Sequence, residues 1–305
     1  MGYRREDDPN LPQYNFRRPV DYCSAVFLLT SKKLFDQLGG FSAEFAPAYY
    51  EDTDYCMTVW QNGFKVIYEP LATILHYESA SSGGNDNAVP MMEAHQVKFQ
   101  KKWHQELNKH CAPIPTNVSA ARIATNSTSL KILYIDDRVP ARSLGAGFPR
   151  SDDIVAELAG LGHHVVCVTS TFPLLGDSYA ELPREVELFD GYRFRQKLVS
   201  DYVQCADIVW SSTSQSQAAL REYPAVFRSR QFALVYDAEA IFFQRIDDRK
   251  RLLGEANGTT HELEPTGLEE EIALAKMADV VAVISEADRK IMQEAGLRSV
   301  YVILS

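Results

Sequence analysis

In the second half of the chain, short apolar runs alternate with segments whose apolar residues recur at helical spacing. The apolar runs predict strands at residues 131–135, 165–169, 208–211, 232–236, 280–284 and 300–303. The segments between them predict helices at residues 150–161, 197–203, 214–222, 269–277 and 286–295. Nearly continuous apolar strands that alternate with helices indicate a parallel sheet covered on both faces. We therefore predict an α/β fold for this half, a doubly wound, Rossmann-like domain.

The first half has shorter and less regular elements. Its β-favouring residues predict strands at residues 20–30, 65–68 and 73–76, and its helical patterns lie at residues 31–38, 54–62 and 90–108. Ser31 suits the N-cap of the first helix, and Gly39-Gly40 its end. Gly63 suits the left-handed end of the second helix, and Pro90 the first turn of the third. This half is predicted to be a smaller α/β module.

Residues 111–129 separate the two halves. They contain two prolines and many small polar residues but no sustained apolar period, as is typical of a linker. A chain of 305 residues is long enough for two separate cores. We therefore predict one domain at residues 1–110, a linker at residues 111–129 and a second domain at residues 130–305.

Composition and charge narrow the class of protein. A net charge of −10 argues against nucleic acid as a partner, because a phosphate backbone needs a basic surface. The five cysteines include no C-x-x-C pair, which favours a reducing compartment over a disulfide framework. No apolar run approaches the length of a membrane span, although docking at a membrane surface stays open. The sequence thus predicts a soluble, cytoplasmic protein.

Three carboxylates stand close together at the start of the second predicted helix, at Glu51, Asp52 and Asp54. A carboxylate in the first turn of a helix is favoured in its charged form by the helix dipole. Asp52 could therefore act as a general base, which takes the proton from an attacking hydroxyl group. Acidic residues in a first turn are also common as helix caps, so the catalytic and the structural interpretation both remain open.

The surroundings of this cluster resemble family 2 glycosyltransferases of the GT-A fold. The resemblance covers residues 2–108 and is carried, in order, by residues 20–25, 38–41, 50–54 and 63–68, then by His76 with residues 79–83. These enzymes extend O-antigen, capsule and other surface polysaccharides, often with rhamnose. The resemblance implies a nucleotide sugar as donor, a glycan as acceptor, and inversion at the anomeric carbon.

Carried over by position, the resemblance implies a role for each residue of the cluster. Asp52 would be the catalytic base, and Glu51 and Asp54 would help to bind the acceptor or to orient that base. His76 corresponds to a histidine near the metal and the diphosphate, so it is the candidate ligand of Mg²⁺ or Mn²⁺. A histidine at the end of a strand with a backbone partner is the alternative for His76.

The chain departs from the family pattern before Tyr22. The family begins with an apolar strand that carries the nucleotide site, followed by an Asp-x-Asp metal motif, and neither precedes Tyr22 here. The first half therefore looks like an acceptor-binding half without its donor-binding half. We accordingly expect the isolated chain to show no measurable sugar transfer.

A second candidate site follows the first strand of the Rossmann-like half. Gly145 and Gly147 lie in the turn before a predicted helix, where doubly wound sheets bind phosphates or sugars, and Asp237 follows a later strand. The turn with the two glycines is therefore a candidate site for a ligand. The alternative is that the glycines are turn residues and Asp237 is a strand-end cap.

This half resembles the N-terminal domain of GT-B glycosyltransferases of family 4. The resemblance spans residues 130–305 and is carried by residues 130–138, 161–165, 235–240 with Arg245, and 278–289. It implies that this half binds the acceptor and that a domain beyond it holds the nucleotide sugar. On this resemblance, Gly145, Gly147 and Asp237 are our substrate-binding candidates for lining the interdomain cleft. Enzymes of this family retain the anomeric configuration.

Together the two resemblances imply a fragment of a multidomain glycosyltransferase. It would transfer a hexose or rhamnose from a nucleotide sugar to a surface polysaccharide or O-antigen acceptor. The alternative is a non-catalytic module that binds glycan acceptors or acts as a scaffold for partner transferases.

Overall fold

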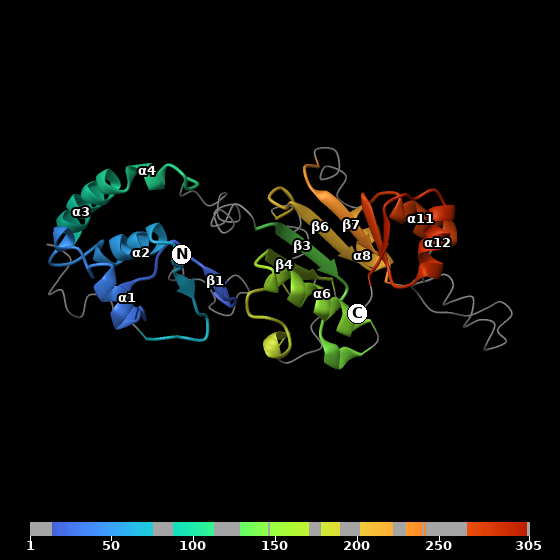
Figure 1. Ribbon diagram of the computed structural model, residues 1–305, viewed down its shortest axis with the longest axis horizontal. Coiled ribbons are helices and arrows are strands. Elements are labelled where there is room, and N and C mark those ends of the chain that lie inside the picture. The colour runs from blue at the N-terminus through green and yellow to red at the C-terminus, as the bar shows by residue number, and fades with distance from the viewer. Residues whose placement is uncertain are drawn as a thin grey trace. The chain divides into compact units, whose positions relative to one another are not determined.

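The computed structural model describes residues 14–75, 88–112, 129–145, 147–170, 178–189, 202–221, 230–239, 241 and 267–303. The chain divides into two compact units, Met1–Ser127 and Thr128–Ser305 (Figure 1). Across the described ranges, none of the helices combines the length and the apolar character needed to span a membrane.

The second unit is built on a seven-stranded sheet in which every neighbouring pair of strands is parallel. In spatial order the strands are β5 (Glu187–Phe189), β4 (His164–Thr169), β3 (Lys131–Asp136), β6 (Ile208–Ser212), β7 (Ala233–Asp237), β8 (Val280–Val283) and β9 (Val300–Val302). This arrangement confirms the predicted α/β fold with a parallel sheet.

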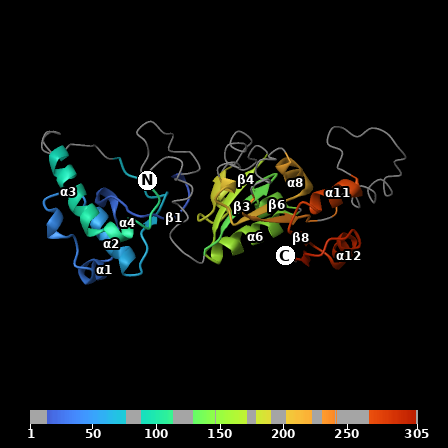
Figure 2. The ribbon, with the colours of Figure 1, turned by 90° about the horizontal axis from the view of Figure 1, so that it is seen from above.

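Helices cover both faces of this sheet. Helix α6 (Phe148–Gly160) buries Val155 against one face, and α8 (Ser214–Leu220) buries Leu220 against the other (Figure 2). Helices α11 (Leu268–Ala275) and α12 (Glu286–Glu294) extend the helical layers toward β8 and β9. The near-continuous burial of β3, β4 and β7 follows from this two-sided cover.

The strand order reverses at β3. The chain moves from β3 to β4 and β5 on one side, and then returns to place β6 on the other side of β3. Where the strand order of an open parallel sheet reverses, the loops after the two neighbouring strands run in opposite directions. Ligands bind in the crevice between these loops, at the carboxyl ends of the strands. A ligand-binding site in this unit is therefore expected at the carboxyl ends of β3, β6 and β7.

One strand of the second unit was not predicted. Strand β5 is three residues long and begins with Glu187, a residue type that rarely lies inside a sheet. Glu187 is buried, and its carboxylate accepts a hydrogen bond from the Tyr202 hydroxyl group at 2.8 Å. This partner, fifteen residues further along the chain, makes a buried charged residue tolerable in a strand. Most of the predicted helix at residues 197–203 lies outside the described residues.

The first unit contains four described α-helices: α1 (Lys32–Gln37), α2 (Glu51–Gln61), α3 (Ala88–Lys102) and α4 (His104–Leu107). A short antiparallel ribbon pairs β1 (Arg18–Pro19) with β2 (Ile67–Tyr68). Two small apolar clusters hold the helices together. One centres on Phe45, Met57, Phe99 and Trp103, and the other on Tyr55, Cys56, Val59 and Val66.

The predicted strand at residues 20–30 is wrong. A 3₁₀ turn at Ala25–Phe27 interrupts it, because the Ser24 side chain accepts the Val26 N–H and the Ser24 carbonyl accepts the Phe27 N–H. Local bonds of this kind compete with a ladder. The predicted strand at residues 73–76 is also absent where it is described, at residues 73–75.

The helix boundaries differ from prediction in two places. Helix α2 begins at Glu51 rather than at residue 54, so all three carboxylates lie in its first turn. The predicted helix at residues 90–108 is divided at Trp103, whose side chain is buried and turned into the first apolar cluster. Two predicted boundaries are confirmed. Ser31 is the N-cap of α1, and Gly63 adopts a left-handed conformation after the end of α2.

Candidate functional site

The loop that leads into α2 has a strained backbone. Tyr49 and Tyr50 have φ angles of 72° and 74°, a left-handed region that residues with a Cβ seldom occupy. The buried His95 of α3 places its Nδ1 atom 3.0 Å from both the Ala48 and the Tyr49 carbonyl oxygen. Because carbonyl oxygens only accept, Nδ1 carries the proton and donates it. Strain that the surroundings hold in place is characteristic of functional loops.

Asp52 is held in position by neutral donors. Its Oδ2 atom accepts the Ala25 N–H at 3.0 Å, and its Oδ1 atom accepts the Thr53 N–H at 2.7 Å. The side chain is half-buried, and no lysine or arginine of the described residues forms an ion pair with it. Its charge also reaches Tyr22, because burial first and then the Asp52 carboxylate raise the pKa of that hydroxyl group. Asp52 is thus oriented without being neutralised.

Asp54 has a different environment. It is buried, and its carboxylate accepts the Trp103 indole N–H at 2.7 Å and pairs with the Lys102 ammonium group at 2.7 Å. These contacts tie the first turn of α2 to the end of α3. Both carboxylate oxygens of Asp54 thus have partners on or next to α3, and none of these contacts involves Asp52. Glu51 lies beside them with a buried Oε2 atom that has no hydrogen-bond partner.

Replacing Asp54 by asparagine is expected to destabilise the first unit by about 1.5–3 kcal/mol, because two hydrogen bonds to a charged acceptor are weakened. The free energy of unfolding is measured by urea denaturation of the chain, with circular dichroism as the readout. The matched control is Glu106→Gln, which affects the exposed Lys109–Glu106 pair and should change the stability by less than about 1 kcal/mol. An Asp54 variant as stable as the control would contradict the structural role.

The predicted metal ligand His76 lies outside the described residues. Within the residues that are described, no group of three or more histidine, cysteine, aspartate or glutamate side chains could hold a metal ion. The described part of the first unit therefore supplies the acidic cluster but not a complete site for Mg²⁺ or Mn²⁺.

In the second unit, buried polar side chains gather where β3, β6 and β7 end. Asp237 is fully buried, pairs with the Arg150 guanidinium group at 2.7 Å and accepts the Glu239 N–H at 3.1 Å. Ser212 is in register with Asp237, and Asp136 follows the registered pair Ile135 and Ser211 by one residue. Residues in register on parallel strands point to the same face of the sheet, so Asp136, Ser212 and Asp237 share one face. The structure thus places Asp237, one of our candidates, at the end of β7, next to the end of β6.

Glu239 occupies the N-terminal end of α6. Its carboxylate accepts hydrogen bonds from the Ser151 and Ser212 hydroxyl groups, at 3.1 and 3.3 Å. A Cβ atom at Gly147, the residue before α6, would lie 2.7 Å from Glu239 Oε2, so a side chain there would displace this carboxylate. Gly145 has a φ angle of 70°, which also favours glycine. The position where a doubly wound fold usually binds an anion is therefore filled by an internal carboxylate.

Two buried atoms of this cluster have no hydrogen-bond partner in the described structure. They are Oδ2 of Asp136 and Nη2 of Arg150, and both residues are more than nine-tenths buried. Burial first, and then the nearby carboxylates of Asp137 and Glu239, raise the pKa of Asp136 well above its usual range. Unsatisfied buried polar atoms are rare in folded proteins, and they mark this cluster as a place where a polar ligand would be stabilised.

Asp136 is expected to make the second unit less stable as the pH rises. Between the usual aspartate pKa and the raised folded value, the unfolded chain has lost a proton that the folded chain keeps. Stability then falls by about 1.4 kcal/mol per pH unit. Asp136→Asn should remove this slope while its side-chain oxygen still accepts the Asp137 N–H. Urea titrations at a series of pH values, with tryptophan fluorescence as readout, give the free energy of unfolding as a function of pH. Equal pH slopes in the wild type and in Asp136→Asn would show that Asp136 ionises normally.

Sequence reasoning missed several residues of the two sites. His95, Lys102 and Trp103 lie some forty or more positions from the acidic cluster that they support, and no local pattern connects them. Arg150 and Glu239 carried a weak signal, since one lies in the first turn of a predicted helix and the other lies two residues after Asp237.

No protein-family model matches this sequence, and no curated protein matches it either. The functional interpretation accordingly depends on the residues themselves and on the geometry in which the fold places them.

Proposed function

We propose that this chain is part of a glycosyltransferase that transfers a hexose or rhamnose from a nucleotide sugar to a surface polysaccharide acceptor. The observation that carries the proposal is the environment of Asp52, which is oriented by the Ala25 and Thr53 N–H groups and left without a cation. A general base needs both properties, since it must point at the acceptor and keep its affinity for a proton.

In the proposed reaction, the acceptor hydroxyl group attacks the anomeric carbon of the donor sugar and gives its proton to Asp52. The new C–O bond forms as the bond to the diphosphate breaks, and the diphosphate leaves with the electron pair. Such a single displacement inverts the anomeric centre. A bound Mg²⁺ or Mn²⁺ ion would neutralise the departing diphosphate, and His76 is the residue that we propose near it.

The second unit is proposed to be the acceptor-binding, N-terminal domain of a retaining family 4 transferase. Its polar cluster at the ends of β3, β6 and β7, with Gly145, Gly147 and Asp237, would bind the hydroxyl groups of an acceptor. Because Glu239 already places a carboxylate at the start of α6, a neutral acceptor suits this position better than a phosphate. Parent proteins with both modules would form two different linkages.

The proposal is tested in the cells that naturally make the chain. We expect disruption of the gene to reduce the incorporation of a labelled nucleotide sugar into surface polysaccharide, and reintroduction of the intact gene to restore it. The donor panel should include nucleotide-activated rhamnose, glucose, galactose and mannose. Unchanged incorporation from every donor, with unchanged polysaccharide composition, would refute a transferase role.

A further inference from the structure

A hollow of about 360 Å³ lies in the first unit, away from the acidic cluster. Met57 and Trp60 of α2 line it together with Asp21, Glu106, Lys109 and His110. Its volume is within the range of about 300–1,000 Å³ that is usual for small-molecule sites. The hollow belongs to the C-terminal half of α2, whereas Asp52 belongs to its first turn.

Trp60 presents an apolar surface of fixed orientation to this hollow. Its indole N–H donates to the Val20 carbonyl oxygen at 3.0 Å, so the polar edge of the ring is already satisfied. Trp60 also packs at the edge of the cluster formed by Tyr55, Cys56 and Val59. The part of the ring left for a ligand is therefore the apolar face, which suits the C–H surface of another ring.

The polar groups of the rim contact one another in pairs. The Lys109 ammonium group lies 2.9 Å from both carboxylate oxygens of Glu106, and His110 Nδ1 lies 3.5 Å from Asp21 Oδ1. The rim thus offers several hydrogen-bond donors and acceptors, and its two carboxylates, Asp21 and Glu106, disfavour an anionic ligand. Such a lining favours a ligand that has many hydroxyl groups and no charge.

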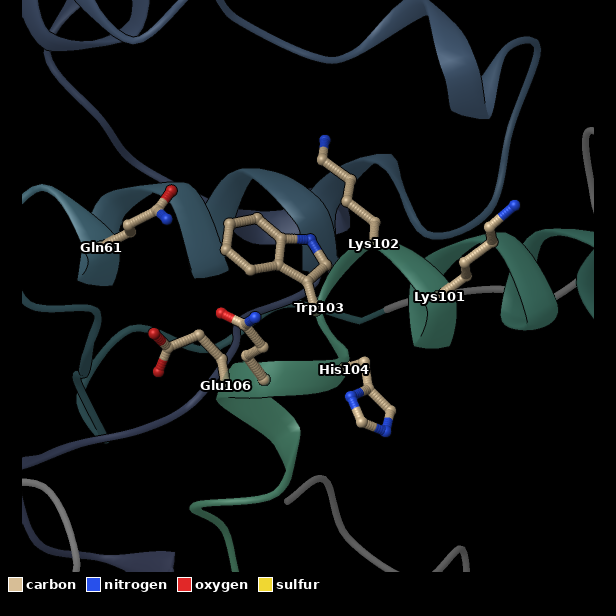
Figure 3. Close-up of a pocket in the computed structure, with 7 residues that line it drawn as sticks. Gln61, Lys101, Lys102, Trp103, His104 and Glu106 are labelled. Carbon is tan, nitrogen blue, oxygen red and sulfur yellow. The ribbon is translucent and has the colours of Figure 1, made fainter.

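An adjoining hollow of about 730 Å³ has a different character (Figure 3). Gln61 and Glu106 line both hollows, but the larger one adds Lys101, Lys102 and His104. In Figure 3 the Trp103 ring lies against α2, where it packs with Met57, whereas the His104 side chain points away from α2. Cations outnumber the single carboxylate there, so the two hollows are expected to select different ligands.

We propose that the smaller hollow binds one neutral sugar unit of a glycan, stacked on Trp60 and hydrogen-bonded by the rim. This inference rests on the proposed function in taking the glycan acceptor as the ligand. Trp60 follows Asp52 by eight residues, which is about 12 Å along the axis of α2. The hollow is therefore a separate subsite, and only a glycan longer than one unit would contact both places.

The test is an NMR titration of the whole 305-residue chain with the methyl glycosides of rhamnose, glucose and galactose, and with inorganic phosphate as the charged probe. We expect the Trp60 indole N–H signal to shift with at least one glycoside and to remain unchanged with phosphate. Trp60→Leu should weaken glycoside binding about tenfold or more, as is usual for a central tryptophan. Lys109→Ala should weaken it too, while Lys101→Ala, on the adjoining hollow, should leave it unchanged.

The outcomes separate this inference from the proposed function. Glycoside binding that depends on Trp60 and Lys109 but persists in Asp52→Asn supports the subsite, whether or not transfer is detected. If no glycoside shifts the Trp60 indole N–H signal, the proposed subsite is wrong, even if disruption of the gene reduces the incorporation of labelled sugar. Shifts caused by phosphate, or equal loss in Lys101→Ala and Lys109→Ala, also overturn it. Trp60→Leu removes a packed ring and could unfold the first unit. In that case Lys109→Ala, which changes an exposed side chain, still tests whether the rim of the smaller hollow binds the glycoside.

Discussion

Asp52→Asn is expected to reduce sugar transfer by about 10²–10⁴-fold, the usual contribution of a general base. The asparagine oxygen still accepts one of the N–H groups that position Asp52, but it takes no proton from the acceptor. The midpoint of thermal unfolding should fall less than in Asp54→Asn, because the Asp52 side chain is only half-buried and forms no ion pair with the described residues. The measurement is the incorporation of labelled sugar after the substitution is made in the natural gene.

Asp36→Asn is the matched control for this prediction. Asp36 belongs to an exposed i,i+4 pair with Lys32 on α1, so the same change of charge occurs there without touching the candidate base. Incorporation should stay at the wild-type level. If Asp52→Asn also leaves incorporation unchanged, Asp52 is a helix-start residue and not the base.

Asp237→Asn is expected to destabilise the second unit by about 3–5 kcal/mol, because it leaves the buried Arg150 guanidinium group without its anion. For a unit of this size, the loss corresponds to a fall of roughly 6–20 °C in the midpoint of thermal unfolding. The Trp210 indole N–H also donates to Asp237, at 3.4 Å, so tryptophan fluorescence reports the change directly. Urea denaturation gives the free energy.

The double variant Arg150→Met with Asp237→Leu should recover part of this loss, since it removes both buried charges together. The matched control is Glu294→Gln, which breaks the exposed Lys290–Glu294 pair and should cost less than about 0.5 kcal/mol. A loss of less than about 1 kcal/mol in Asp237→Asn would mean that the pair with Arg150 is dispensable.

The sheet of the second unit could be predicted because its strands are apolar along their whole length. Strands such as β3 and β4 read as continuous hydrophobic runs, and the turns between them carry glycine or polar residues. Strand β5 could not be predicted, because the burial of Glu187 depends on Tyr202, a partner from a different segment.

The first unit was less predictable because local bonds override its apolar pattern. Residues 20–30 favour a strand by composition, yet the Ser24 side chain and carbonyl close a 3₁₀ turn, and Leu29 remains 97% exposed. The three carboxylates of α2 could be located from the sequence. Their separate environments could not, because Lys102 and Trp103 reach Asp54 from α3 and from the break before α4.

The central claim is that Asp52 reacts with the acceptor, whereas its neighbour Asp54 holds the structure. The most direct measurement compares labelled-sugar incorporation in cells whose natural gene carries Asp52→Asn or Asp54→Asn, divided in each case by the amount of folded protein. We predict a loss of at least about 100-fold for Asp52→Asn and a change of less than about threefold for Asp54→Asn. Equal losses in the two variants, or full activity per folded molecule in Asp52→Asn, would contradict the account.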